Sequence, residues 1–189
     1  MLNSVTLRFT RRERDTVFNN DLVGIFVTFV VLSLAPPVYA AEKFPDYPVR
    51  PADQYAIKAE RAGLIIGVEP VEDLNDQKVY FDARTTPNGF IPVFVVIENR
   101  SSGDSFLFDQ TNVGYGGAFY GFKPDMGTTK RQENLLKRHI KSKTLSPGAS
   151  VSGFLYVPVP GKGPREKIHL QVPITKAGTS ETFMLNLFF

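Results

Sequence analysis

Carboxylates are the residues of this chain whose spacing most invites a chemical role, and they crowd residues 69–82 with Lys78 as the single cation among them. Paired carboxylates can hydrolyse glycosidic bonds or bind calcium. The Asp73-x-x-Asp76 spacing differs, however, from the alternating Asp-x-Asp-x-Asp-Gly pattern of a calcium loop. The pattern favours a solvated helix with acids near its positively polarised N-terminal end, and a hydrolase is the alternative. The five carboxylates are Glu69, Glu72, Asp73, Asp76 and Asp82.

The two histidines, His139 and His169, are the other candidates for metal binding or proton transfer. His139 lies in a cationic stretch and His169 on the outward side of an alternating one, so no spacing brings both to a carboxylate. The absence of cysteine excludes disulfides and thiolate-bound zinc. No His-Glu-x-x-His motif, Gly-x-Ser-x-Gly elbow or P-loop occurs either. We therefore expect no catalytic residue, no metal and no cofactor.

A glycine-rich stretch within residues 114–127 carries a group of aromatic rings that could bind a partner. Glycines permit positive φ angles, and neighbouring rings can form a stacking platform for a sugar or a peptide. The alternative is that the rings pack inward and attach this stretch to the rest of the fold. The second interpretation is favoured because exposed apolar patches are uncommon on a monomer without a partner. The rings are Tyr115, Phe119, Tyr120 and Phe122.

Positive charge gathers in residues 123–143, where seven cations face only Asp125 and Glu133. Apolar residues at helical spacing predict a helix near 128–141 beneath these charges. The cations could contact anionic lipid headgroups or an acidic polymer, or could form the solvated face of a helix packed over one end of the fold. Together with the rings, the candidate partner surface includes Lys137, Arg138 and Lys141.

The elements that must position these residues are mainly β-strands. A nearly continuous β-branched and aromatic run over 90–99 predicts a central strand. The alternating patterns of 167–175 and 182–189, separated by a short turn, predict a hairpin. A short helix is expected over 72–82, capped by Glu72 or Asp73. The fold class is therefore an antiparallel Ig-like β-sandwich of about seven strands with a helical insertion near 128–141. The predicted strands span 63–70, 90–99, 105–108, 112–115, 150–159, 167–175 and 182–189.

Three of these stretches resemble a group of uncharacterised bacterial exported or lipid-anchored proteins. They are the Gly67-Val68-Glu69-Pro70 segment, the Gly89-Phe90-Ile91-Pro92-Val93-Phe94-Val95-Val96-Ile97-Glu98-Asn99 strand and the Ser146-Pro147-Gly148-Ala149-Ser150-Val151-Ser152-Gly153-Phe154 segment. The resemblance covers roughly residues 60–189 and implies an Ig-like sandwich. It implies no activity and transfers no functional residue. This chain lacks the lipid-attachment cysteine common in that group.

The N-terminal 40 residues have the features of a secretory signal peptide. Four arginines precede an apolar run, Leu22–Ala35, which has the length of a signal-peptide core and falls short of the ~18–20 residues that span a bilayer. Pro36-Pro37 ends this helix, and small residues precede a cleavage site after Ala40. An uncleaved anchor is the alternative. The expected organisation is a signal peptide (1–40), an extended leader or linker (41–60) and an Ig-like domain (61–189).

These expectations converge on an exported protein, periplasmic or extracellular, in a bacterium. The formal net charge of +3 includes four arginines of the signal peptide, so no nucleic-acid partner is expected. The predicted function is a non-enzymatic interaction module of the bacterial envelope with a protein or envelope partner. The first alternative is a peripheral binder of an anionic membrane or polymer through residues 123–143. The second is a hydrolase that uses the carboxylates of residues 69–82.

Overall fold

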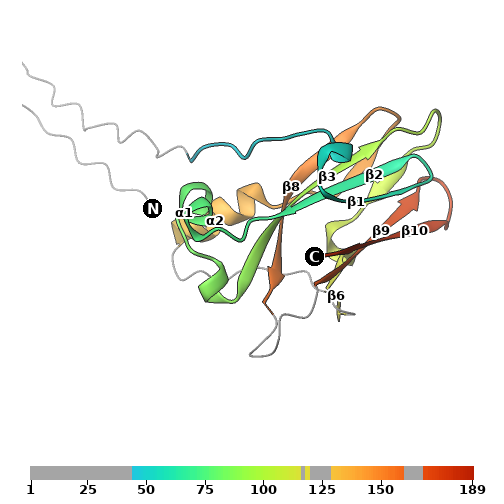
Figure 1. Cartoon of the computed structure of the whole chain (residues 1–189). Helices are drawn as coiled ribbons and strands as arrows, with labels where there is room; N and C mark the ends of the chain where they lie inside the picture. Colours follow the sequence, from blue (N-terminus) through green and yellow to red (C-terminus); the bar gives the residue numbers. More distant parts are fainter. Residues whose placement is uncertain (1–43, 116–117, 120–128, 160–167) are drawn as a thin grey trace, which may run out of the picture. The chain divides into compact units, whose positions relative to one another are not determined.

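The computed structural model describes residues 44–115, 118–119, 129–159 and 168–189, which form a mainly β structure of two antiparallel sheets with two α-helices (Figure 1). The predicted signal peptide, its cleavage site and the rings of Tyr120 and Phe122 lie outside these residues. The mainly β class and both helices are as the sequence predicts. The number of strands differs from the prediction, since the described residues form ten strands where about seven were expected.

The first sheet has the strand order β1-β2-β3-β8. β3 is paired on both sides and buried over most of its length, which confirms the central strand expected from its apolar run. β1 and β2 are joined by a tight turn in which Ala62 and Gly63 have φ angles of 53° and 79°. A Cβ on Gly63 would also lie 2.9 Å from the Cα of Ser101. The strands are β1 (Ile57–Arg61), β2 (Leu64–Pro70), β3 (Phe90–Asn99) and β8 (Ser150–Pro158).

The second sheet is built around β9 (His169–Lys176), whose residues 169–175 pair with β10 (Thr182–Phe188). This pair confirms the predicted hairpin. On its other side β9 pairs with β4 at one end and β5 at the other, and these two strands pair in turn with β7 and β6. The remaining strands are β4 (Phe106–Phe108), β5 (Gly114–Tyr115), β6 (Ala118–Phe119) and β7 (Lys143–Leu145).

The main core lies between the two sheets, because alternate residues of each strand point to one face. Leu64, Ile66 and Val68 of β2 belong to this core, as their alternation predicts. Leu185 and Leu187 of β10 meet them from the opposite sheet. Each fully buried aliphatic side chain of this kind contributes about 1.5–3 kcal/mol through its removal from water.

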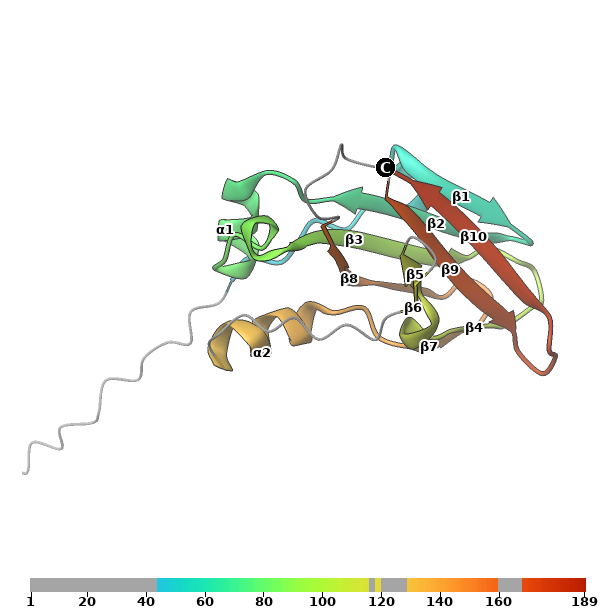
Figure 2. The same cartoon turned by 90° about the horizontal axis from the view of Figure 1, so that it is seen from below.

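A second apolar cluster covers the outer face of the β1-β2-β3-β8 sheet. Helices α1 (Leu74–Phe81) and α2 (Thr129–Arg138) lie at one end of the strands, and the segment 45–55, with the 3-10 helix η1 (Ala52–Gln54), crosses the same face (Figure 2). The ring of Phe154 is central to the cluster, with centroid distances of 4.8 Å to Phe81 and 4.9 Å to Phe94. Tyr47 places its ring 5.1 Å from that of Phe154.

The predicted boundary between a leader (41–60) and a domain (61–189) needs correction. β1 begins at Ile57, and Ala52 and Tyr55 are fully buried against the sheet. Gly67 of β2 makes this approach possible, since a Cβ there would lie 2.4 Å from the carbonyl oxygen of Ala52. The alternation in β1 is weak because Lys58, Glu60 and Arg61 are exposed along an edge strand. The segment from residue 44 onward is therefore part of the folded unit.

Both helices differ in detail from their predictions. Asp73 caps α1 as expected, because its carboxylate accepts hydrogen bonds from the backbone N–H groups of Asn75 (2.6 Å) and Asp76 (3.1 Å). The helix begins at Leu74 rather than at 72, Leu74 is 37% exposed, and α1 buries Gln77 and Phe81. α2 ends at Arg138 rather than near 141. The buried residue Ile140 therefore lies in the chain that follows the helix.

Candidate functional site

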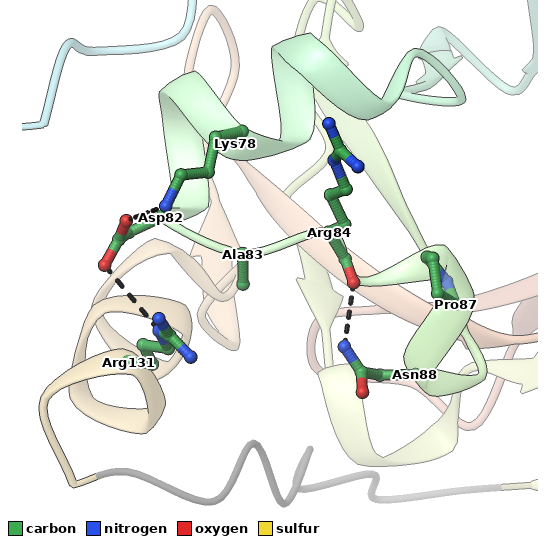
Figure 3. A pocket seen from close by; sticks show the side chains of 7 residues that line it. All are labelled: Lys78, Asp82, Ala83, Arg84, Pro87, Asn88 and Arg131. Carbon is green, nitrogen blue, oxygen red and sulfur yellow. Dashed lines mark hydrogen bonds and ion pairs between the residues drawn. The ribbon is translucent and has the colours of Figure 1, made fainter.

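A pocket of about 570 Å³ lies between α1, the chain that leaves it and α2 (Figure 3). Four of the residues described as lining it carry charge, and only one of these is an acid. The charged residues are Lys78, Asp82, Arg84 and Arg131. Ala83, Pro87 and Asn88 complete the described lining.

The loop at the pocket is held by the buried side chain of Gln77, which lies in the middle of α1. Its amide nitrogen donates to the carbonyl oxygen of Val71 (2.7 Å) and to the hydroxyl of Thr86 (2.6 Å). Its amide oxygen accepts the backbone N–H of Thr86 at 3.1 Å. The Gln77 side chain therefore makes three hydrogen bonds and holds the segment that follows α1 in place.

Two further features shape this loop. Asp82 ends α1 in the left-handed conformation (φ 53°), and its N–H donates to the carbonyl oxygen of Lys78. Asp and Asn adopt this conformation more readily than most residues. Farther on, the 3-10 helix η2 (Thr86–Asn88) brings the Asn88 amide back to donate to the carbonyl oxygen of Arg84 at 2.8 Å. The backbone on either side of Arg84 is thus constrained.

Asp82 connects the two helices electrostatically. One carboxylate oxygen lies 2.6 Å from Nζ of Lys78 on α1, and the other lies 3.6 Å from Nε of Arg131 on α2. The hydrogen bond from Lys78 and the charges of Lys78 and Arg131 hold the pKa of Asp82 below its usual value. These groups remain partly exposed, so the ion pairs contribute little stability.

Arg84 differs from the other two cations. Figure 3 shows it apart from the Lys78–Asp82–Arg131 group, on the other side of the pocket. Its guanidinium has no hydrogen bond or ion pair with any residue that the structure describes. The described lining holds three cations, which can attract and orient an anion.

The predicted aromatic surface has only one ring whose surroundings are known. Tyr115 lies in β5 and packs against the core between the sheets, and burial raises the pKa of its hydroxyl. Its position favours inward packing over an exposed stacking platform. Phe119 lies in β6, while its side chain, Tyr120 and Phe122 fall outside the described residues.

The three cations selected from the sequence have different environments. The guanidinium of half-buried Arg138 donates to the carbonyl oxygen of Pro45 (2.8 Å) and to Asn134 (3.2 Å). Nζ of Lys141 donates to the carbonyl oxygen of Leu136 at the end of α2 (3.0 Å). Lys137 is exposed and has no such partner among the described residues. The structure therefore does not assemble them into one uniform binding patch.

Three of the five carboxylates of residues 69–82 have separate roles. Glu69 accepts hydrogen bonds from the Tyr47 hydroxyl (3.1 Å) and from the Arg50 guanidinium (2.8 Å), while Asp73 caps α1 and Asp82 lies in the pocket. Within the described parts of the chain, no cluster of three or more acidic or histidine side chains is arranged to hold a metal ion.

The two histidines lie in separate environments. Nδ1 of His139 is 2.9 Å from the carbonyl oxygen of Ile140, to which it donates, and burial lowers the pKa of this imidazole. His169 lies on the second sheet, stacked on Phe188 with ring centroids 4.3 Å apart. Its Nε2 is 2.8 Å from the amide oxygen of Asn186.

The pocket was not predicted as a site, although Lys78 and Arg131 belonged to segments noted for their charge. Arg84 had no such signal in the sequence. The one local clue was the Asn88-Gly89 pair, which indicates a turn. In the structure the Thr86–Asn88 turn constrains the backbone beside Arg84. Nothing in the sequence indicated that residues 78–88 and 131 would meet.

No protein-family model, curated protein or solved structure matches the chain. Among the described residues, no helix has the length and apolar character needed to cross a membrane.

Proposed function

We propose that this protein is a non-enzymatic interaction module of the bacterial envelope that binds an anionic partner through the α1–α2 pocket. The observation that carries the proposal is the described lining of the pocket. It holds three cations and one carboxylate, and one of its arginines has no protein partner among the described residues. Binding sites commonly lie on loops and helices that a rigid sheet positions. The proposal includes two expectations from the sequence, namely the export signal and the Ig-like arrangement of the sheets.

The pocket replaces the basic segment 123–143 as the main contact in this proposal. Arg131 comes from that segment and lies 3.6 Å from Asp82, whereas Arg138 and Lys141 make shorter hydrogen bonds to backbone carbonyl oxygens. The non-enzymatic role rests on the described lining, whose cations can hold an anion. The hydrolase alternative has no comparable support, because Asp73 already caps α1.

Co-sedimentation with an isolated bacterial envelope fraction, at low and at physiological salt, tests the proposal. We expect the double variant Arg84→Glu/Arg131→Glu to lose most of the binding that wild type shows. The matched control, Lys130→Glu/Lys137→Glu, makes the same change in charge on exposed positions of α2 outside the described pocket lining. If the control variant loses binding and the pocket variant retains it, the basic helix is the contact and the pocket proposal fails.

Export is tested separately. Mass spectrometry of the protein recovered from outside the bacterial cytoplasm should show Ala41 as its first residue. Recovery of intact residues 1–40 would contradict cleavage and favour a retained anchor.

A further inference from the structure

We propose that two copies of this chain associate by pairing their β10 strands (Thr182–Phe188) edge to edge and antiparallel, so that their second sheets join into one continuous sheet. The inference goes beyond the proposed function, because it concerns a surface other than the α1–α2 pocket and needs no anion. An edge strand presents backbone N–H and C=O groups without partners, and these groups can pair with a strand of another chain.

The edge strands of the two sheets differ in how they are protected from such pairing. Natural proteins protect an edge with charged side chains, with a very short strand or with a covering segment. β1 carries Lys58, Glu60 and Arg61, and β6 and β7 have only two and three residues. β8 is met by the chain after α2, since the N–H of Ile140 donates to the carbonyl oxygen of Phe154. β10 has seven residues without a charge, and among the described strands it pairs only with β9.

The pairing of β10 with β9 determines which backbone groups point to the open edge. Ile168 and Phe189 exchange two backbone hydrogen bonds (2.7 and 3.1 Å), and such pairs alternate with pairs that exchange none. Residues 183, 185 and 187 therefore bond to β9, and the even-numbered residues direct their N–H and C=O groups to the edge. Pro173, which has no N–H, fits this alternation because it lies opposite one of the even-numbered residues. The even-numbered residues are Thr182, Met184, Asn186 and Phe188.

The edge of β10 is accessible. Of its four even-numbered residues, Met184 is half-buried and the other three are exposed. Figure 2 shows β10 as the outermost strand of its sheet, with β1 of the first sheet beside it. β1 contacts β10 through side chains, since the guanidinium of Arg61 lies 5.4 Å from the centroid of the Phe183 ring, and the two strands are not hydrogen-bonded neighbours. β10 therefore keeps a row of backbone donors and acceptors for another strand.

The strand best suited to this row is a second β10, because the row is complementary to itself. A two-fold axis at Leu185 places Thr182 opposite Phe188 of the second copy and Met184 opposite Asn186, so that all four residues exchange backbone hydrogen bonds. A shift by two residues leaves either Phe188 or Thr182 unpaired. Like charges directly opposite each other destabilise a strand pair, and β10 contains none. The exposed ring of Phe188 would then lie against Thr182 of the second copy.

Sedimentation equilibrium of the protein purified after export, over a range of concentrations, tests the association. We expect a monomer–dimer equilibrium for wild type. Met184→Pro removes an N–H that points to the edge, and an edge strand tolerates proline where its N–H faces solvent. The monomer should therefore fold, while the dissociation constant of the dimer should rise about tenfold or more, because the symmetric pair loses two hydrogen bonds.

A matched pair of charge variants keeps the test valid should Met184→Pro fail to fold. Asn186→Lys places a cation on the open edge and should weaken the dimer. Gln171→Lys is the control, since Gln171 lies opposite Asn186 in the register but belongs to β9, one strand farther from the edge. It should leave the dimer unchanged. Melting curves of all variants verify that they fold.

Disulfide crosslinking tests the register. The chain has no cysteine, so an introduced thiol is its only one. Residues that exchange backbone hydrogen bonds across an antiparallel pair have Cα atoms about 5.5 Å apart, which suits a disulfide. We expect a mixture of the single variants Met184→Cys and Asn186→Cys to form a covalent dimer on mild oxidation, and neither variant to do so by itself.

Three results would overturn the inference. They are a monomer at every concentration, a dimer that both Met184→Pro and Asn186→Lys leave unchanged, and crosslinking of Met184→Cys or Asn186→Cys alone, which would require another register. If wild type is monomeric and these edge variants lose co-sedimentation with the envelope fraction, β10 pairs with a strand of another protein and the assignment to a second copy fails. The pocket variant Arg84→Glu/Arg131→Glu should remain dimeric, so the proposed function and this inference can fail independently.

Discussion

The outer faces of the two sheets differ sharply, although both sheets are built from strands of the same alternating kind. On the first sheet, Phe94 and Phe154 point outward and are buried beneath the helices and the segment 45–55. On the second, the outward side chains of β9 and β10 pair with each other, as Gln171 does with Asn186 (3.5 Å) and Thr175 with Thr182 (3.0 Å).

The difference shows where a sheet protein of this kind can form a concave site. The outer face of the second sheet carries the paired polar side chains of β9 and β10, and Phe188 on that face is 57% exposed. Helices packed on the other sheet leave a space where α1, its following loop and α2 meet. The cover therefore creates the pocket, and anything that loosens the cover should alter the pocket before it alters the second sheet.

The largest effect is expected from removing a ring at the centre of the cover. Phe154→Ala should destabilise the protein by about 3–5 kcal/mol, because it deletes a side chain that is 2% exposed and leaves a cavity among several rings. Phe188→Ala on the other outer face should cost less than about 1 kcal/mol. Urea unfolding measures both. Equal losses would mean that the two outer faces contribute alike, and the comparison would fail.

A smaller effect is expected from pushing the segment 45–55 off the sheet. Gly67→Ala places a methyl group 2.4 Å from the carbonyl oxygen of Ala52 and 2.5 Å from the Tyr55 ring, so the segment must move at a cost of about 1–3 kcal/mol. Gly103→Ala is the control, since a Cβ there meets nothing within 4 Å. Hydrogen exchange should show faster exchange in residues 45–55 of the first variant alone. Unchanged exchange there would show that the segment adapts without leaving the sheet.

Two neighbouring cations of α2, Arg138 and Lys137, are expected to differ in their contribution to stability. Arg138→Gln should destabilise by about 0.5–1.5 kcal/mol, since it removes the hydrogen bond to the carbonyl oxygen of Pro45. Lys137→Gln should change the free energy of unfolding by no more than about 0.5 kcal/mol, because this exposed side chain has no described partner. Chemical denaturation of the pair provides the measurement. A larger loss for Lys137→Gln would mean that the helix depends on charges outside the described contacts.

The smallest effect concerns pH. Burial, helped by the nearby charge of Lys141, lowers the pKa of His139 from its usual 6.5 in the folded state. The unfolded chain then binds a proton more readily, so the contribution of neutral His139 to stability is present above pH 6.5 and is lost as the pH falls through the folded-state pKa. The free energy of unfolding, measured from pH 8 to pH 5, should decline less for His139→Gln than for wild type. A decline of equal size would assign the effect to other groups.

Much of the fold follows from local patterns in the sequence. The alternation in β2 and β10 and the continuous apolar run of β3 are sufficient to place these strands and their inward faces, and the Asp73 cap places the start of α1. These signals are visible because side chains repeat every second residue in a strand, and because a helix needs its first N–H groups satisfied nearby. β7 (Lys143–Leu145) has no such signal, since only Leu145 of its three residues is buried.

The sequence by itself therefore determined a mainly β protein with most of its strands, two helices and no cysteine chemistry. Only the tertiary structure decided that segment 45–55 covers a sheet, that Tyr115 packs inward and that Arg138 bonds to Pro45. The pocket belongs to this second group, because Arg84 and Arg131 are far apart in the chain and meet through the packing of α1 and α2 on one sheet. Local periodicity reports which face of an element is buried, whereas the partner on that face depends on contacts between distant residues.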